Sequence, residues 1–286
     1  MTAGLSSSAL LSEHSQSNGW QAALELRLEK INGRTCLLPQ QRLGPLTVQR
    51  AFYPEGDVCH VYVLHPPGGV VGGDKLKLEV DVKTGARALI TTPGASKYYR
   101  SAGKTANLKQ IINVNGDASL EFFPLESIYF PATELKSKII INLDKDAQFA
   151  GWEIHCFGLP ANKETFNSGH VLLNTELRVD GKVLLHDRLK VDHLEQDRTS
   201  GLRGNPVYGS LVVYSKSINK GLLDSIQSVQ TGGGLAGVSL VAPNMLVARY
   251  LGDSTEAAQA YFRQLWRSIR PVAMDLGVCE PRIWNT

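Results

Sequence analysis

Five carboxylates in the sequence stand beside strongly apolar neighbours, and they are the side chains best suited to chemistry. An apolar surrounding penalises the charged form of a carboxylate and raises its pKa, which suits general acid or base work. The same residues also fit the solvated, outward positions of alternating strands. The sequence alone therefore makes them candidates without fixing a role. They are Asp74, Glu121, Glu126, Glu153 and Glu176.

Two segments have part of a nucleotide-binding loop but lack its context. Residues 65–74 contain two Gly pairs, yet an alternating strand follows them, whereas a phosphate-binding loop needs a helix N-terminus. Gly103-Lys104-Thr105 has the ending of a P-loop, but Tyr98 occupies the position of the required earlier glycine. The sequence also contains no G-x-S-x-G nucleophile elbow. These patterns favour neither a nucleotide site nor an acyl-transfer site.

The sequence also contains few patterns of metal-ligating residues. Cys59-His60 and His155-Cys156 are adjacent pairs, and adjacent side chains on a strand point to opposite faces, which disfavours a closed tetrahedral site from either pair. The four cysteines lie far apart and form no C-x-x-C pair, so neither a zinc site nor a disulfide framework is indicated. We therefore expect no tightly bound cofactor.

Composition limits the class of protein. The chain has 286 residues, 43% of them hydrophobic, which is enough for one large core. Its formal charge of +3 is too small for the electrostatic footprint of a nucleic-acid binder. No segment approaches the ~20 apolar residues that cross a bilayer, and residues 1–18 lack the pattern of a secretory signal. We expect a cytoplasmic protein, with neither nucleic acid nor a membrane among its partners.

Strand patterns dominate the chain up to residue 217. Apolar and polar residues alternate over 24–29 and 75–82, and turn-forming dipeptides punctuate the strands. Repeated hairpins predict an antiparallel sheet rather than a parallel sheet with crossover helices. No fixed-period repeat is visible, so self-similarity supports neither a propeller nor a regular solenoid. The four dipeptides are Asn32-Gly33, Thr84-Gly85, Asn115-Gly116 and Asp180-Gly181.

The hydrophobic period becomes helical near the C-terminus. Apolar residues recur at spacings of three and four over 218–229 and 258–269, and Ser254 is the expected N-cap of the second helix. Residues 238–241 and 245–251 have strand character. The predicted architecture is a flexible N-terminal tail at 1–18, followed by a mostly β fold at 19–286. This second part is a single large antiparallel β-rich domain with two α-helices in its C-terminal half.

Several blocks of sequence carry a family resemblance. They include Gly44-Pro45-Leu46-Thr47-Val48-Gln49-Arg50, Phe52-Tyr53-Pro54-Glu55, the segment 65–74, Thr92-Pro93-Gly94-Ala95-Ser96-Lys97, Tyr99-Arg100-Ser101, Gly151-Trp152-Glu153, and Pro281-Arg282-Ile283-Trp284. In this order they resemble the signature blocks of the UreD (UreH) family of urease accessory proteins, over about residues 20–286. In one departure, Leu159-Pro160 follows Gly158, where the family usually carries Arg.

The resemblance implies a β-rich scaffold that binds the urease apoprotein with UreF and the GTPase UreG. Such a scaffold assists GTP-dependent nickel insertion and catalyses nothing itself. Nickel is then transient cargo on a route of scattered ligand atoms, because a full ligand set would hold the ion too tightly. The five carboxylates become candidates for that route. Tyr99, Arg100 and Trp284 are candidates for contacts with partner proteins.

Two other interpretations remain open from the residues. An all-β hydrolase would use Glu121 and Glu126 as facing carboxyls in a deep pocket. A ligand-binding module would present a shallow aromatic platform and form a stable monomer. The search for motifs supports neither interpretation. Each predicts a feature that a scaffold does not need, namely the deep pocket with facing carboxyls or the shallow aromatic platform.

Overall fold

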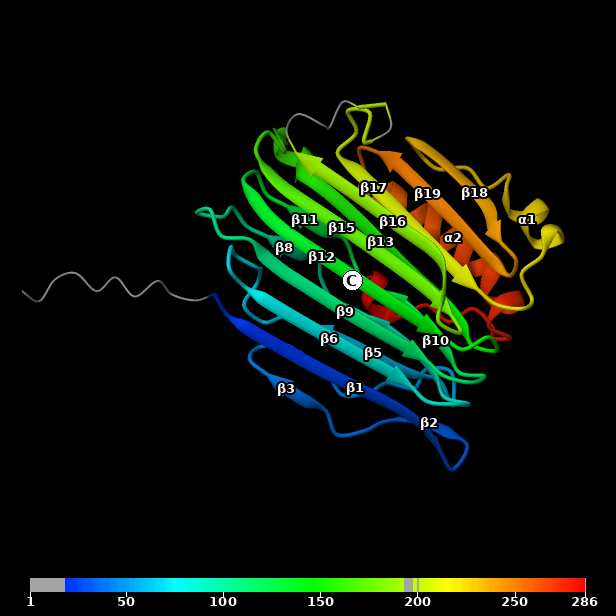
Figure 1. Cartoon of the computed structure of the whole chain (residues 1–286). Coiled ribbons are helices and arrows are strands. Elements are labelled where there is room, and N and C mark those ends of the chain that lie inside the picture. The colour runs from blue at the N-terminus through cyan, green and yellow to red at the C-terminus, as the bar shows by residue number, and fades with distance from the viewer. Residues whose placement is uncertain (1–18, 193–197, 200, 286) are drawn as a thin grey trace, which may run out of the picture.

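The computed structural model describes residues 19–192, 198–199 and 201–285. The tail predicted at 1–18 lies outside these residues. Within them the chain forms two β-sheets that pack face to face, with a helical layer on the second sheet (Figure 1). No helix in the described part is both long enough and apolar enough to cross a bilayer.

The first sheet has eight strands, in the order β16-β15-β12-β9-β6-β1-β2, with β3 paired to β1. Its centre is parallel, from β1 through β15, whereas β16, β2 and β3 add antiparallel at the two edges. The strands are β1 (Gln21–Ile31), β2 (Arg34–Leu37), β3 (Gln41–Leu43), β6 (Lys75–Val82), β9 (Ala106–Val114), β12 (Thr133–Leu143), β15 (Gly169–Val179) and β16 (Lys182–Asp192).

The second sheet has eleven strands, and its centre is also parallel, from β5 through β7 and β10 to β13. An antiparallel extension, β17-β19-β18, follows β13. The strands are β4 (Thr47–Val48), β5 (Cys59–Leu64), β7 (Arg87–Thr91), β8 (Ser96–Tyr98), β10 (Ser119–Phe123), β11 (Ser127–Tyr129), β13 (Gln148–Leu159), β14 (Glu164–Thr165), β17 (Val207–Tyr214), β18 (Leu235–Ala242) and β19 (Met245–Gly252).

The chain alternates between the two sheets as it proceeds. β5, β7, β10 and β13 join the second sheet, while β6, β9, β12 and β15 join the first, so each coil adds one parallel strand to each sheet. The result is a β-solenoid-like body. The mostly β class with two helices is confirmed, but the prediction of an antiparallel domain was wrong, because both sheets are mixed.

Turn geometry explains this error. At Asn32-Gly33 and Asp180-Gly181 both residues have positive φ, as a type I′ hairpin requires, and antiparallel pairs flank each turn. At Thr84-Gly85 and Asn115-Gly116 only the glycine has positive φ, 73° and 56°. These two turns instead carry the chain from the first sheet into the second. The four dipeptides look alike in sequence but differ in the backbone of their first residue.

The turns that leave β6, β9 and β12 repeat one device. The amides of Ala86, Ala118 and Ala147 each donate to the carbonyl three residues earlier, at 2.9, 3.0 and 3.0 Å, and all three alanines are fully buried. The two intervals between these alanines differ in length. The coil therefore repeats in space without a fixed period in sequence, which is why a search for self-similar segments does not reveal it.

Two cores hold the layers together. The first fills the space between the inner faces of the two sheets. The second lies between the other face of the second sheet and the helices α1 (Lys220–Ile226) and α2 (Thr255–Ala273). Ser254 caps α2 as predicted, since its side chain accepts from the Ala257 amide. Two 3₁₀ helices, η1 (Pro160–Asn162) and η2 (Arg282–Asn285), complete the fold.

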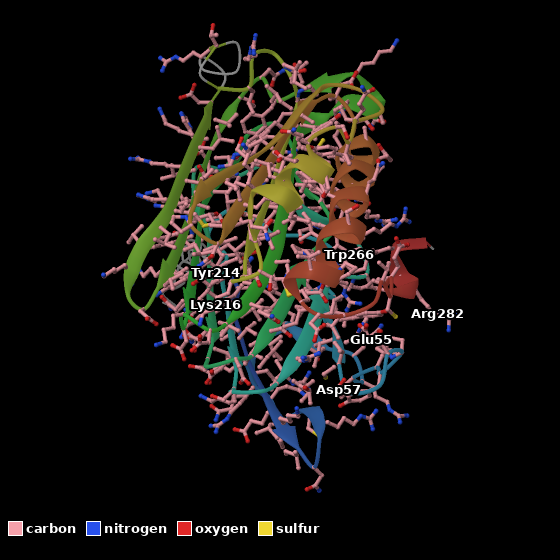
Figure 2. All side chains as sticks on the ribbon, turned by 90° about the vertical axis from the view of Figure 1, so that its right-hand side faces the viewer. Glu55, Asp57, Tyr214, Lys216, Trp266 and Arg282 are labelled. Carbon is pink, nitrogen blue, oxygen red and sulfur yellow. The ribbon has the colours of Figure 1, made fainter. Side chains whose placement is uncertain are left out.

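A buried ionic cluster fastens α2 to the second sheet. Arg270 of α2 is fully buried, and its Nη2 donates to Glu121 Oε2 of β10 at 2.8 Å and to Glu55 Oε1 at 2.7 Å. Trp266 Nε1 donates to Glu121 Oε1 at 2.6 Å, and His60 Nε2 lies 2.7 Å from Glu55 Oε1. Figure 2 shows Glu55 and Trp266 on the same side of the molecule. One guanidinium thus joins the helix, a central strand and the loop before β5.

The charges in this cluster support one another. Burial favours the neutral form of Arg270, but hydrogen bonds and charge from Glu55 and Glu121 outweigh it and raise the pKa of Arg270. Burial also raises the pKa of Glu55, but hydrogen bonds from His60 and Arg270 outweigh that effect and lower it overall. Both Glu55 and Arg270 are therefore charged at neutral pH.

Removing the guanidinium should be far more harmful than removing an exposed one on the same helix. Arg270→Leu leaves two carboxylates buried without their cation, so we expect it to lower the unfolding free energy by about 3–5 kcal/mol. Arg267→Leu is the control, because Arg267 is 55% exposed and pairs with Glu280 at the surface. It should change stability by at most about 1 kcal/mol. Urea denaturation followed by fluorescence measures both, and equal losses would contradict the role given to Arg270.

Candidate functional site

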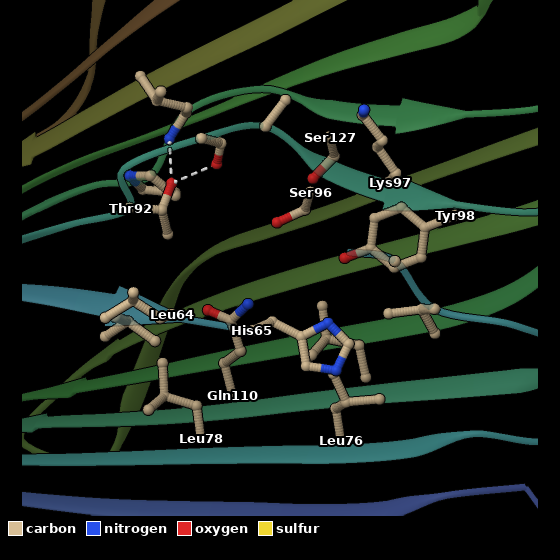
Figure 3. Close-up of a pocket in the computed structure, with 18 of the residues that line it drawn as sticks. Leu64, His65, Leu76, Leu78, Thr92, Ser96, Lys97, Tyr98, Gln110 and Ser127 are labelled. Carbon is tan, nitrogen blue, oxygen red and sulfur yellow. Dashed lines mark hydrogen bonds between the residues drawn. The ribbon is translucent and has the colours of Figure 1, made fainter. Parts of the chain in front are cut away.

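A cavity of about 290 Å³ lies between the two sheets, and we call it the inter-sheet cavity. One wall is the inner face of β6, β9 and β12, and the other includes β7, β8 and β11. Figure 3 shows Gln110 on the first wall, with Ser96 and Ser127 on the facing one. Loops 65–69 and 92–95, which include exposed residues, form its rim. The lining is mostly apolar, with polar groups at a few positions.

The glycine-rich segment 65–74 contributes part of this rim. At two of its positions a side chain larger than that of glycine would collide with neighbouring atoms. A Cβ added at Gly69 would lie 2.2 Å from the Tyr99 ring, and one at Gly72 would lie 2.1 Å from Ser101 Oγ. The backbone therefore approaches the 97–104 segment more closely than any side chain allows. The glycines serve packing at the rim, in agreement with the argument against a phosphate loop.

A chain of polar side chains contributes Tyr129, Glu153 and His155 to the cavity wall. The Tyr129 hydroxyl lies 2.8 Å from His155 Nδ1, and His155 Nε2 lies 3.6 Å from Glu153 Oε1. Thr175 Oγ1 donates to Glu153 Oε2 at 2.6 Å. Glu153 and His155 are two residues apart on β13 and so share a face, whereas Thr175 comes from β15 in the first sheet. This polar chain bridges the two sheets.

Glu153 gives the cavity wall a negative charge. Its side chain is 20% exposed. Burial raises the pKa of Glu153, but the contact with His155 and the hydrogen bond from Thr175 outweigh burial and lower it overall. Burial raises the pKa of Tyr98 to about 12 and also raises that of Tyr129 well above its ordinary value, so both phenols stay neutral. Of the described residues that line the cavity, Glu153 is the one carboxylate.

This arrangement can hold a cation loosely. A carboxylate, an imidazole and a hydroxyl are oxygen and nitrogen donors for a divalent transition metal. Over the described ranges, no three or more His, Cys, Asp or Glu side chains gather into a metal site. A cation at Glu153 would therefore complete its coordination with water or with atoms of another chain.

The other predicted carboxylates lie elsewhere and have partners of their own. Asp74 accepts from the amides of Trp20 and Val71 at 2.8 and 2.9 Å, which fixes the turn before β6. Glu176 faces outward on β15 and pairs with Arg178. The structure does not bring these two together with Glu153. Their place on a nickel route stays a prediction.

Glu121 and Glu126 do not form a facing pair in the cavity. Glu121 points to α2 and is neutralised by Arg270. Glu126 accepts from Gln259 Nε2 of α2 at 2.6 Å. Neither carboxylate lines the inter-sheet cavity, which is the site that a hydrolase acting through them would need. Their roles as route residues also stay predictions.

The three predicted partner contacts differ in access. Arg100 is exposed, and Tyr99 is half-buried with its ring 4.8 Å from that of Phe130. Trp284 is only 6% exposed and packs in the helix-side core against Trp152, with ring centroids 5.1 Å apart. Arg100 is thus the most available of the three to another protein. No observation tests the contacts themselves.

Reasoning from the sequence missed His155, Tyr129 and Thr175. His155 and its neighbour Cys156 face opposite ways, as their adjacency on a strand predicts, since Cys156 lies in the helix-side core. The useful signal was the spacing of Glu153 and His155, which places two donors on one face of a strand. Thr175 and Tyr129 come from other strands and carry no local signal.

The fold and the cavity together define a β-solenoid-like protein with a charged internal chamber. The model of the UreD urease accessory protein family matches residues 21–285. This chain therefore belongs to the UreD family of urease accessory proteins, as the resemblance of its sequence blocks indicated.

Individual relatives agree with the family model. A urease accessory protein UreD of Alcanivorax borkumensis is 42% identical over 278 residues, which cover 94% of this chain and 93% of that protein. A UreD of an Azoarcus species is 41% identical over 276 residues, or 96% of both chains. A UreD of Klebsiella aerogenes is 37% identical over 268 residues, or 94% of this chain and 97% of that protein. The similarity thus spans nearly the whole length of each protein.

The lowered pKa of Glu153 predicts a dependence of stability on pH. A carboxyl with a lowered folded-state pKa stabilises the fold above its unfolded value, and this contribution is lost as the pH falls through the folded value. Glu153→Gln should therefore make the unfolding free energy fall less steeply below about pH 5. Glu55, which has the same direction of shift, keeps part of the slope in that variant.

Urea unfolding at a series of pH values measures this slope. Glu164→Gln is the matched control, because Glu164 is exposed on β14 and distant from the polar chain. The control should keep the wild-type slope. If the stability of the Glu153→Gln protein depended on pH as steeply as that of the wild type and of the control, Glu153 would have no lowered pKa in the fold.

Proposed function

We propose that this chain is a scaffold and metallochaperone in urease maturation. It binds the urease apoprotein together with UreF and UreG, and it assists GTP-dependent insertion of nickel into the urease active site. UreG hydrolyses the GTP, this chain catalyses no reaction, and the complex acts in the cytoplasm. Membership of the UreD family supports the proposal, since the relatives are named as urease accessory proteins.

The inter-sheet cavity with ionised Glu153 is the observation that carries the proposal. Ni²⁺ is transient cargo and enters this cavity, where Glu153 and His155 offer it one oxygen and one nitrogen donor. Nickel binds tightly to a complete set of such donors, so an incomplete set favours release. The protein thereby attracts the ion without retaining it.

The surroundings of Glu153 suit a moving ion. Thr175 and His155 hold the carboxylate in place, so it needs little reorganisation when a cation arrives. The neutral Tyr98 and Tyr129 hydroxyls add no charge that would trap the ion. A cavity of about 290 Å³ also has room for several water molecules, so Ni²⁺ keeps part of its hydration shell.

The partner part of the proposal predicts a stable assembly. The tagged chain, expressed beside the urease structural subunits, UreF and UreG, should copurify with urease subunits and with UreF. The same preparation from cells that express an unrelated tagged β-protein is the control. Retrieval of none of these proteins would leave the proposed scaffold role without support and would contradict it.

The cargo part of the proposal predicts a loss of nickel delivery. Glu153→Ala should lower urease activity and the nickel content of purified urease by about tenfold or more, because it removes the charged donor in the cavity. The amounts of copurified partners should stay at the wild-type level. Glu164→Ala, at an exposed position, should activate urease normally. Normal nickel content with Glu153→Ala would remove Glu153 from the route.

A further inference from the structure

The outer face of the first sheet carries cations that the strand register brings together. Parallel pairing sets Lys77 of β6 opposite Lys109 of β9, and Lys109 opposite Lys138 of β12. A second row lies two residues nearer the strand starts, and β16 continues both rows. We call this set the basic band: Lys75, Lys77, Lys109, Lys136, Lys138, Arg188 and Lys190.

The basic band aligns like charges that the fold does not require. Neighbouring strands lie about 4.8 Å apart, so Lys109 has a like charge on each side. Like charges directly opposite one another destabilise a sheet, and any polar residue would satisfy these outward positions. Within the band, Lys77 is compensated by Glu79 at 2.7 Å and Lys190 by Asp192 at 3.0 Å, and the charge of Lys138 helps to lower the pKa of Glu176. Lys109 and Lys138 are exposed, and neither forms an ion pair with any residue that the structure describes.

No other layer of the described chain covers the band. α1 contacts β18, and α2 contacts β13, β17 and β19, so both helices belong to the second sheet. Figure 1 shows the outer face of β6, β9, β12, β15 and β16 toward the viewer, with α2 behind. The five strands make the band about 20 Å wide. The repulsion therefore faces solvent, where a second molecule can relieve it.

Apolar side chains beside the band indicate a protein rather than a nucleic acid. Ile111 and Ile140 stand opposite each other in the next row, half-buried on the outer face. Leu172 of β15 lies within the band itself. Protein interfaces combine an apolar centre with a polar rim. Glu79 and Glu176 share the isoleucine row and would repel phosphates that continued past the band.

We propose that the basic band is a docking face for a protein partner with a flat surface rich in carboxylates. The partner's carboxylates neutralise Lys109 and Lys138, and its apolar centre covers Ile111, Ile140 and Leu172. This goes beyond the proposed function, which assigns no surface of this chain to any partner. It also explains why like charges are aligned on a sheet that does not need them.

A defined acidic polypeptide tests the proposal on the whole chain alone. Fluorescein-labelled poly-L-glutamate of about 30 residues is titrated at about 50 mM NaCl and followed by anisotropy. The double variant Lys109→Glu/Lys138→Glu should bind about tenfold more weakly than wild type. The control, Lys163→Glu/Lys220→Glu, makes the same change in net charge at exposed positions off the sheet, and it should bind within about twofold of wild type.

Each alternative outcome overturns the proposal. Equal losses in the two double variants would show that only net charge matters. Tighter binding of a single-stranded DNA oligonucleotide, lost in the same band variant, would mark a nucleic-acid site instead. Lys109→Gln adds a test that needs no ligand. It should raise the urea midpoint because it relieves repulsion, and a lowered midpoint would contradict that repulsion. These experiments use no urease protein. Their results can therefore be interpreted even if the proposed function in urease maturation is wrong.

Discussion

The buried charge of Arg270 is the constraint on which the helix side of the molecule depends. An unpaired guanidinium cannot stay in an apolar core, so α2 must meet Glu121 of β10 and Glu55 at the same point. That requirement fixes β10, whose opposite face contributes Phe122 to the inter-sheet cavity. β10 in turn pairs in register with β13, which carries Glu153 and His155. An ionic contact on one face of the second sheet thereby positions the wall of the cavity on its other face.

The first sheet is a single wall that separates two different environments. The inner faces of β6, β9 and β12 line the cavity with residues such as Leu78 and Gln110. Their outer faces carry the aligned lysines. This division follows from the period of two in a strand, which sends alternate residues to opposite faces. The β-solenoid-like fold thereby encloses the inter-sheet cavity between two thin walls and leaves the broad outer face of the first sheet exposed.

Local chemistry predicted much of this fold. Asn32-Gly33 and Asp180-Gly181 form the expected hairpins, and Ser254 caps α2, because these features depend on neighbouring residues. The solenoid escaped prediction because its coils differ in length and because φ at Thr84 and Asn115 cannot be read from a dipeptide. Glu153 and Glu121 looked equivalent as carboxylates among apolar residues. What separates them is Arg270, 149 residues from Glu121 in the chain, and no sequence spacing reveals such a partner.

We propose that a cation passes through the inter-sheet cavity at Glu153. Crystals of this chain, soaked in a nickel salt and measured at the nickel absorption edge, test that claim directly by locating the ion. We predict an anomalous peak between the two sheets, beside the Glu153 carboxylate and the His155 ring. Peaks confined to exposed histidines such as His170 and His186, with none in the cavity, would contradict it.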